Sequence, residues 1–194
     1  MPDLRRKRLP LSRVLRHHPC GLSIRPDGYF KCNEILKLKH FKSSTLEHLQ
    51  HIVTTDTKMR YSMCEIEGEL YIKANQGHSI FFSAYLNDNL MMIKLDLSAE
   101  KYIYHGTDGS VIDLIMKDGL KSMDRIHIHF VTNENPAFQL SGFRSKSNII
   151  ITVDMHQAMI AGFDFFQAPN GVILTRGIDG TLPITFITNV TKRS

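Results

Sequence analysis

The spacing of apolar residues changes once, close to residue 60, and this change constrains the fold more than any other feature of the chain. Upstream, apolar residues recur with helical spacing in three short segments, near residues 11–15, 35–38 and 46–53. Downstream, residues 60–66 and 69–73 have the pattern of two strands around a turn at Glu67-Gly68. The first part of the chain is therefore expected to contain three helices followed by a hairpin.

The sequence also predicts where these helices begin and end. Pro19 stops the first helix, and Pro26-Asp27-Gly28 predicts a turn. Asn33 is expected to cap the second helix, and Ser44-Thr45-Leu46-Glu47 has the spacing of a capping box at the start of the third. Three helices and a hairpin occur in this order in winged-helix lobes. Such lobes commonly bind nucleic acid, although a fold alone does not establish a function.

The second half of the chain predicts a mixed α+β lobe. Ile80-Phe81-Phe82 is expected to be a buried strand, and Asn87-Asp88-Asn89 a loop that precedes the lobe. Strand-like segments follow at 101–105, 126–131, 148–153, 163–167, 171–175 and 184–190, with helix-like segments at 109–117, 134–140 and 155–161. The helix at 109–117 is expected to end at Gly119. Many short strands with few helices favour an α+β lobe over a doubly wound parallel sheet. The Gly-x-Gly-x-x-Gly fingerprint of Rossmann folds is absent, so any dinucleotide must be held in another way.

Positive charge is concentrated near the beginning of the chain. Residues 1–60 carry 13 Lys and Arg against 5 Asp and Glu, whereas residues 61–194 carry 11 against 14. This asymmetry indicates that the first part meets a polyanion such as nucleic acid. An ordinary solvated surface is the alternative, and charge alone favours it.

Other features of the sequence argue against secreted and membrane proteins. The apolar stretches are too short to cross a bilayer, and the basic start leads into no apolar segment of the kind found in secretory signals. The three cysteines, Cys20, Cys32 and Cys64, form no Cys-x-x-Cys pair and cannot all pair with one another. We therefore expect an intracellular, reduced protein, cytoplasmic or, in a eukaryote, nuclear.

Four basic side chains are candidates for binding phosphate. Arg16 and His17 end the first helix, Arg60 opens the hairpin, and Arg125 precedes the strand at 126–131. Guanidinium groups form bidentate hydrogen bonds with phosphate, so arginine suits a dianionic monoester. The alternative is that each is a separate surface residue, and spacing alone cannot bring them together.

Histidines mark a second candidate region. His105, Gly106 and Thr107 place an imidazole at the end of a strand, with a hydroxyl close behind it, and the glycine allows a ligand to approach the backbone. A satisfied structural histidine is an equally good interpretation of His105. His127 and His129 alternate with apolar residues and so share one face of their strand. No third ligand at suitable spacing accompanies them, so we expect no metal.

Together these segments resemble the RNA 2′-phosphotransferase family, often called tRNA 2′-phosphotransferases. The matching stretches are residues 11–17, 27–29, 56–61, 72–79, 104–107, 119–120, 123–129, 142–144 and 170–175. They occur in the order found in the family and cover nearly the whole chain. The Ala-Asn-Gln-Gly-His-Ser stretch at 74–79 and the Arg-x-His-x-His stretch at 125–129 are specific in combination.

The resemblance implies an α+β protein in which an N-terminal winged-helix lobe is packed on a C-terminal ADP-ribosyltransferase-like mixed α/β lobe. We expect the RNA-binding lobe to span residues 1–95 and the NAD-binding lobe residues 96–194. The activity implied is NAD-dependent removal of an internal 2′-phosphate from RNA, such as a tRNA splice junction. NAD is consumed as a co-substrate, the partner is 2′-phosphorylated RNA, and a monomer without membrane contact is expected.

The family's functional tetrad maps onto Arg16, His17, Arg60 and Arg125 in this sequence. The resemblance also implies two sets of binding residues: for NAD, His105, Gly106, Thr107, His127, His129 and Arg144; for substrate RNA, His78 and Ser79. No metal is implied. The stretch at 170–175 contains no acidic residue, which supports an acceptor that carries its own charge.

Two alternatives to 2′-phosphate transfer stay open. One is an NAD-dependent enzyme that ADP-ribosylates terminal phosphates of RNA or DNA. The other is a non-catalytic RNA-binding module, against which the complete set of basic residues argues.

Overall fold

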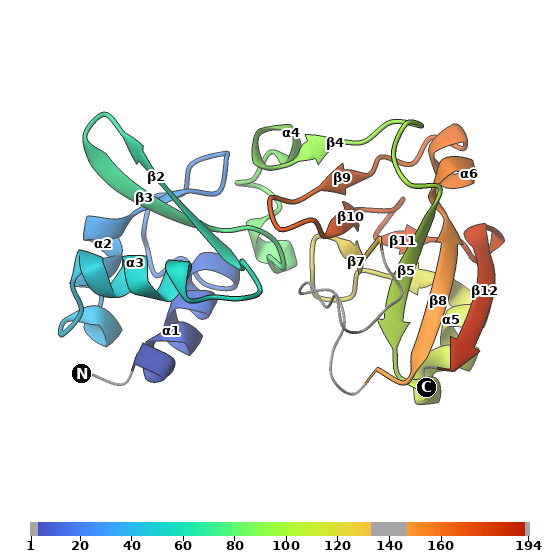
Figure 1. Ribbon diagram of the computed structural model, residues 1–194, viewed down its shortest axis with the longest axis horizontal. Coiled ribbons are helices and arrows are strands. Elements are labelled where there is room, and N and C mark those ends of the chain that lie inside the picture. Colours follow the sequence, from blue (N-terminus) through green and yellow to red (C-terminus); the bar gives the residue numbers. More distant parts are fainter. Residues whose placement is uncertain (1–3, 133–146, 193–194) are drawn as a thin grey trace. The chain divides into compact units, whose positions relative to one another are not determined.

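The computed structural model describes residues 4–132 and 147–192, and internal contacts divide the chain into two compact units, Met1–Met91 and Met92–Ser194 (Figure 1). The described residues form six α-helices and several antiparallel sheets, so the protein is a mixed α/β chain. None of the helices in these residues combines the length and the apolar character needed to cross a bilayer. The expected assignment of RNA to the first lobe and NAD to the second stays a prediction.

Unit 1 combines short helices with a three-stranded sheet. Its α-helices are α1 (Leu4–Arg16), α2 (Cys32–Lys37), α3 (Leu46–Thr54) and α4 (Asp88–Met91), and two short 3-10 helices span Lys39–Phe41 and Ile80–Phe82. The strands β1 (Phe30–Lys31), β2 (Tyr61–Ile66) and β3 (Glu69–Ala74) lie in the order β1-β3-β2. Apolar side chains of the helices and the sheet form a buried core that includes Leu11, Leu15, Ile35, Leu49 and Ile72.

The hairpin of β2 and β3 confirms the change of period seen in the sequence. Ile66 pairs with Glu69, and the two residues between them have φ angles of 51° at Glu67 and 77° at Gly68. Two successive left-handed residues match the right-handed twist of a hairpin, and a glycine at the second position adopts this conformation without a steric penalty.

Two predicted helix caps are wrong in detail. Lys31, and not Asn33, precedes α2, because the helix already begins at Cys32. Helix α3 is capped one residue later than expected: the backbone N–H of Thr45 donates to Nδ1 of His48 at 3.0 Å. The Ser-x-x-Glu pattern points to Ser44 and Glu47, but the fold uses Thr45 with His48, an imidazole in place of the usual carboxylate or amide.

The expected buried strand at Ile80-Phe81-Phe82 is wrong. These residues form a 3-10 helix in which Ile80 and Phe81 are exposed and only Phe82 is buried. Their backbone is satisfied locally, since N–H of Phe82 donates to the carbonyl of Ser79 and N–H of Ser83 to that of Ile80. The loop expected at Asn87-Asp88-Asn89 is also partly wrong, because α4 begins at Asp88.

Unit 2 is built on two antiparallel sheets. One has the order β12-β8-β5 and the other β4-β9-β10-β7 (Figure 1). Their strands are β4 (Ile93–Lys94), β5 (Tyr102–Thr107), β7 (Ile128–Phe130), β8 (Ile149–Asp154), β9 (Phe166–Gln167), β10 (Ile173–Thr175) and β12 (Ile187–Lys192). Backbone hydrogen bonds of 2.9 Å between Tyr104 and Val131 link β5 to the end of β7. Ile103, Phe130, Ile151 and Phe165 belong to the buried core that both sheets share.

Shorter elements complete this unit. A 3-10 turn (Gly109–Val111) leads into α5 (Ile112–Asp118), and α6 spans Met155–Ile160. The short strands β6 (Leu120–Lys121) and β11 (Thr181–Leu182) pair with each other. Helix α5 ends at Gly119 as predicted, with φ 87° and ψ 177°. The predicted helix at 134–140 lies outside the described residues.

Candidate active site

The end of α1 and the loop after β3 bring Arg16 into a defined position in unit 1. The backbone N–H of Ser79 donates to the carbonyl of Arg16 at 2.8 Å. The guanidinium carbon lies 5.8 Å from the centre of the Tyr61 ring, close enough for a cation–π contact. A Cβ on Gly77 would lie 3.5 Å from Nη1 of Arg16, so the loop backbone itself packs against the guanidinium. His17 follows Arg16 and is exposed.

Arg60 is held by the carboxylate of Asp56. Oδ2 of Asp56 accepts from the backbone N–H of Arg60 at 2.6 Å, and Oδ1 pairs with Nη1 of the guanidinium at 2.5 Å. Asp56 is buried, whereas the Arg60 side chain is 34% exposed. Arg60 is therefore anchored on one side and accessible on the other.

Asn75 joins the hairpin to the same region. Its backbone N–H donates to the carbonyl of Arg60 at 2.8 Å, and its side-chain Nδ2 donates to the carbonyl of Met59 at 2.8 Å. Its Oδ1 accepts from the Ser62 hydroxyl at 2.7 Å. Asn75 is 2% exposed, so these bonds lie in the interior of unit 1. They connect the start of β2 to the loop that packs on Arg16.

The two predicted RNA-binding residues lie in this loop. His78 is 2% exposed, and its ring centre lies 5.7 Å from that of Phe82. The Ser79 hydroxyl is buried and has no hydrogen-bond partner among the described residues. The structure thus places Arg16, Arg60, His78 and Ser79 on three joined segments of unit 1: the end of α1, the start of β2 and the loop after β3.

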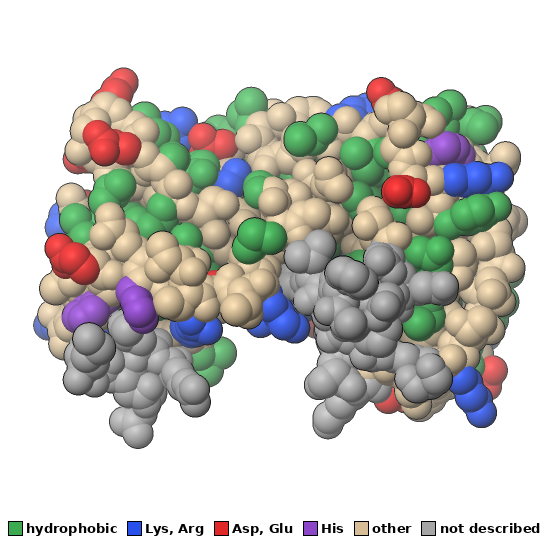
Figure 2. Space-filling model, viewed as in Figure 1, with side chains coloured by type: hydrophobic (Ala, Val, Ile, Leu, Met, Phe, Trp, Pro, Cys, Tyr) green, Lys and Arg blue, Asp and Glu red, His purple; other side chains and the backbone are tan. Residues whose placement is uncertain are grey.

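The hairpin tip has the opposite charge from these segments. Glu65, Glu67 and Glu69 are exposed at the turn, where Figure 2 shows acidic side chains gathered at the upper left. Glu69 pairs with Lys31 of β1. A polyanion is repelled by exposed carboxylates, so the charges of unit 1 favour the base of the hairpin over its tip as the place where phosphate binds.

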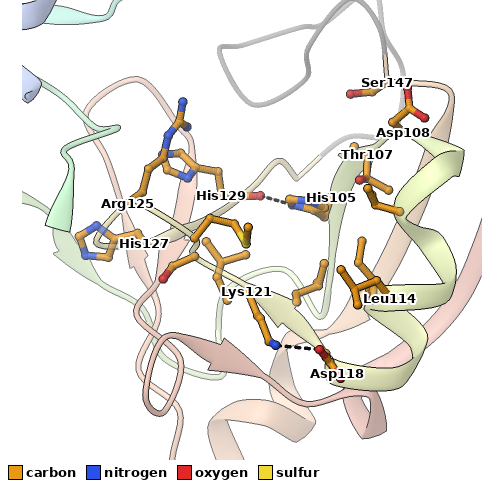
Figure 3. Close-up of a pocket in the computed structure, with 18 of the residues that line it drawn as sticks. His105, Thr107, Asp108, Leu114, Asp118, Lys121, Arg125, His127, His129 and Ser147 are labelled. Carbon is orange, nitrogen blue, oxygen red and sulfur yellow. Dashed lines mark hydrogen bonds and ion pairs between the residues drawn. The ribbon is translucent and has the colours of Figure 1, made fainter.

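Unit 2 contains a pocket of about 550 Å³, a size typical of small-molecule sites. Its walls come from the end of β5, from α5 and β6, and from the segment that leads into β7. Figure 3 shows Arg125, His127 and His129 on one side, with Leu114 and Asp118 across from them. Lys121 pairs with Asp118 at 2.8 Å. The lining combines cationic, polar and apolar side chains, which suits a ligand that has both charged and apolar parts.

His105, Gly106 and Thr107 line this pocket together, as the sequence predicts for a ligand segment. Nδ1 of His105 lies 2.9 Å from the carbonyl oxygen of His129, and the His105 ring packs edge-on against Phe130 at 5.8 Å between ring centres (Figure 3). A carbonyl accepts, so Nδ1 of His105 donates to it. The bond joins β5 to β7 and fixes the orientation of the ring.

His127 and His129 also line the pocket, as does Arg125 just before them. Both histidines are buried. His127 precedes β7, whereas His129 lies within it and is paired with Leu174 of the neighbouring strand β10. Among residues 4–132 and 147–192, no group of three or more His, Cys, Asp or Glu is arranged to hold a metal ion. Arg144, the remaining candidate for NAD, lies outside the described residues.

Comparison with known proteins decides the family. The family model for RNA 2′-phosphotransferase, Tpt1 / KptA family, matches residues 7–177. The chain belongs to this RNA 2′-phosphotransferase family. The match includes Arg16, His17, Arg60 and Arg125, together with the segment from His105 to Thr107.

Individual relatives of the family are similar along most of the chain. A protein of Schizosaccharomyces pombe, provisionally named a tRNA 2′-phosphotransferase, is 40% identical over 185 residues, which cover 93% of this chain and 49% of that protein. The tRNA 2′-phosphotransferase 1 of Homo sapiens is 33% identical over 179 residues, covering 89% and 69%. That of Danio rerio is 30% identical over 175 residues, covering 86% and 76%. The chain thus spans about half the length of the S. pombe relative.

Sequence reasoning missed several residues of these two regions. Asp56 and Asn75 lie in stretches that match the family, but the sequence assigned them no role, although Asp56 stands four residues before Arg60. Leu114 and the pair of Asp118 and Lys121 were also missed, because α5 and β6 line the pocket only after the chain has folded.

Proposed function

We propose that this protein is an NAD-dependent RNA 2′-phosphotransferase, with a winged-helix RNA-binding lobe and an ADP-ribosyltransferase-like NAD-binding lobe. The observation that carries the proposal is that a chain of this family has two separate regions with side chains suited to binding phosphate or a nucleotide. One is the arginine cluster at the base of the hairpin in unit 1, and the other is the pocket around His105 in unit 2.

The arginine cluster suits an internal RNA 2′-phosphate. Arg16 is fixed by Tyr61 and the loop after β3, and Arg60 by Asp56, so both guanidinium groups are ordered without a ligand. Preorganised donors lose little entropy when they bind a phosphate dianion. His17 directly follows Arg16 and is exposed, and its imidazole is suited to exchanging a proton with a hydroxyl. His78 and Ser79, whose polar side-chain atoms are buried, would support this RNA-binding surface from within the loop that packs on Arg16.

The pocket of unit 2 suits the nicotinamide ribose and the adjoining phosphates of NAD. His105 and Thr107 present hydrogen-bonding groups to ribose hydroxyls, and the absence of a side chain at Gly106 leaves the backbone accessible. Arg125, His127 and His129 supply cationic or polar groups on the other side, where phosphate oxygens would be held. When bound, NAD supplies an electrophilic anomeric carbon with nicotinamide as the leaving group.

The proposed reaction has two steps. In the first, an oxygen of the RNA 2′-phosphate bonds to the anomeric carbon of the nicotinamide ribose, and nicotinamide leaves with the electron pair of its C–N bond. In the second, the 2″-hydroxyl of the ADP-ribosyl group attacks phosphorus. The P–O2′ bond breaks, the RNA 2′-oxygen takes up a proton, and ADP-ribose 1″,2″-cyclic phosphate is released. The phosphate nucleophile is already anionic, so positioning and charge balance matter more than a general base.

A product assay tests the proposal. The protein is incubated with NAD and an oligonucleotide that carries one internal 2′-phosphate and a terminal phosphate, and the products are separated and identified by mass spectrometry. Formation of 2′-hydroxyl RNA and the cyclic phosphate in equal amounts is the expected result. An ADP-ribose group left on a terminal phosphate would instead support the alternative enzyme, and no consumption of NAD would support a binding module. The physiological RNA is proposed to be tRNA, in keeping with the names of the relatives.

A further inference from the structure

Asp56 is a buried carboxylate whose two oxygens both serve Arg60. Only 4% of the residue is exposed, and it accepts from the backbone N–H of Arg60 at 2.6 Å and from the guanidinium at 2.5 Å. A buried carboxylate is costly unless charge and hydrogen bonds compensate it. Here Arg60 provides both the compensating charge and the hydrogen bonds, so the two residues form a tightly coupled pair.

The backbone between these residues is shaped to bring them together. Helix α3 ends at Thr54, and N–H of Met59 then donates to the carbonyl of Asp56 at 2.8 Å, which closes a tight turn. Met59 has a φ of 43°, a left-handed conformation that is uncommon for a residue with a side chain. The turn places residue 60 back beside the carboxylate. Asn75 holds its far end, through the bonds to Met59 and Arg60 already described.

This arrangement limits the freedom of the arginine. A guanidinium has five N–H donors in a rigid plane, and one terminal nitrogen of Arg60 is committed to Asp56. With that edge fixed, the plane can turn only slightly, and a side chain that is 34% exposed keeps access to a ligand. An unrestrained arginine loses rotamer entropy when it is immobilised, and here the restraint exists before substrate binds.

We propose that Asp56 is a positioning residue, which sets the orientation of the Arg60 guanidinium toward the RNA 2′-phosphate. The inference rests on the proposed function and goes beyond it, because Asp56 touches neither RNA nor NAD and acts through Arg60 alone. Its negative charge also offsets part of the charge of Arg60. Removing that charge should therefore slow the reaction while RNA binding changes little or becomes tighter.

Two substitutions distinguish two possible roles of Asp56, orienting the Arg60 guanidinium and supporting the turn. Asp56→Ser keeps a short oxygen acceptor for the backbone N–H of Arg60 but cannot reach the guanidinium. Asp56→Asn keeps the shape of the side chain and removes the charge. Asp27→Asn is the matched control, since it removes the carboxylate of a different ion pair in unit 1, that with Arg25.

The measurements are the single-turnover rate of 2′-phosphate removal with excess protein and NAD, and the affinity for the same RNA without NAD. Both Asp56 variants should lose about 100-fold in rate, the size expected when a reacting group is misplaced by about 1 Å. RNA affinity should fall by no more than about 3-fold, or rise, and Asp27→Asn should match the wild-type protein in both measurements. In an Arg60→Ala background, Asp56→Ser should cause little further loss, because its partner is already absent.

Several results would overturn the proposal. Wild-type rates in both Asp56 variants would do so, as would an equal loss of rate with and without Arg60. Loss of the folded state in both variants, seen by circular dichroism, would assign the carboxylate to the fold instead. Failure of the proposed function is distinguishable, because the wild-type protein itself would then remove no 2′-phosphate. An inactive Arg60→Ala with fully active Asp56 variants would reject only the role of Asp56.

Discussion

Single arginines and histidines in this protein differ in how firmly the fold orients them. Arg60 is tied to a buried carboxylate, Arg16 is packed between a ring and a loop backbone, and His105 is bonded to the carbonyl of His129. Such contacts are local and specific to each side chain, so substitutions at these positions test function one residue at a time.

Replacing Arg60 with alanine is expected to reduce 2′-phosphate removal by about 100-fold or more, because a preorganised guanidinium is lost from the phosphate. The substitution also leaves the Asp56 carboxylate buried without its charged partner, which should lower stability by about 3 kcal/mol. Turnover on a 2′-phosphorylated oligonucleotide and thermal unfolding measure the two effects. Wild-type turnover in a folded variant would show that Arg60 does not serve the reaction.

His105→Ala is expected to impair the use of NAD more than the binding of RNA, since His105 lines the pocket of unit 2. The Michaelis constant for NAD should rise or kcat should fall by about 10-fold or more, because a hydrogen bond to a ribose hydroxyl is lost. RNA affinity without NAD should barely change, as a binding titration can check. A large loss of RNA affinity with normal NAD dependence would contradict the assignment of the two lobes.

At the scale of elements, the end of α5 depends on a glycine that no other residue can replace. Gly119 has φ 87° and ψ 177°, and a Cβ there would lie 2.6 Å from the carbonyl oxygen of Leu182 in β11. Gly119→Ala should lower the free energy of unfolding of unit 2 by about 3 kcal/mol. Gly68→Ala is the control: its φ is also positive, but nothing lies within 4 Å of the added Cβ, so it should cost about 1 kcal/mol. Equal losses in the two variants, measured by thermal unfolding, would contradict the steric argument.

The turn before β1 should make unit 1 sensitive to acid. Partial burial raises the pKa of Asp27, but hydrogen bonds from Arg25 and from the backbone of Tyr29 outweigh it and hold the pKa below the ordinary value of 3.8. A lowered pKa in the folded state stabilises the fold above that ordinary value, and the contribution disappears as the pH falls through the folded pKa.

Asp27→Asn should therefore lower the free energy of unfolding by about 0.5 kcal/mol at pH 7, a small figure because solvent screens the pair. The difference from the wild-type protein should vanish once the pH has fallen below the folded-state pKa of Asp27. Chemical unfolding at a series of pH values measures this, and a difference that grows toward acid pH would show that the carboxylate is not stabilised in the folded chain.

At the scale of the whole molecule, the four basic candidates are divided between the two units. Arg16, His17 and Arg60 belong to unit 1, whereas Arg125 belongs to unit 2 and lines its pocket. If unit 2 holds NAD, Arg125 is placed to assist the second step, after the ADP-ribosyl bond has formed. Arg125→Ala is then expected to slow the second step more than the first.

An RNA that carries 2′-phospho-ADP-ribose should accumulate transiently in the Arg125→Ala reaction. It would migrate more slowly than substrate on a denaturing gel. Arg60→Ala serves as the comparison from unit 1. If no single-site variant of the four shows this species over a full time course, the basic residues serve both steps equally or mainly the first.

Much of the architecture could be predicted from the sequence because its signals are local. Helical spacing predicted α1 and α3, and Glu67-Gly68 predicted the hairpin turn, since each depends on the preferences of a few adjacent residues. The end of α5 at Gly119 was predicted for the same reason. Family resemblance also directed attention to the residues that the two regions contain.

Only the tertiary structure decided what these signals leave open. Ile80-Phe81-Phe82 has an apolar run that suits a strand, but its backbone bonds are made locally and no neighbouring strand pairs with it in the described residues. The bond between His105 and His129 joins residues from different strands, and the anchoring of Arg60 needs a turn with a left-handed Met59. The sequence by itself determined which side chains are available and where local elements begin. Their orientation required the folded chain, because it depends on contacts between segments that no local preference encodes.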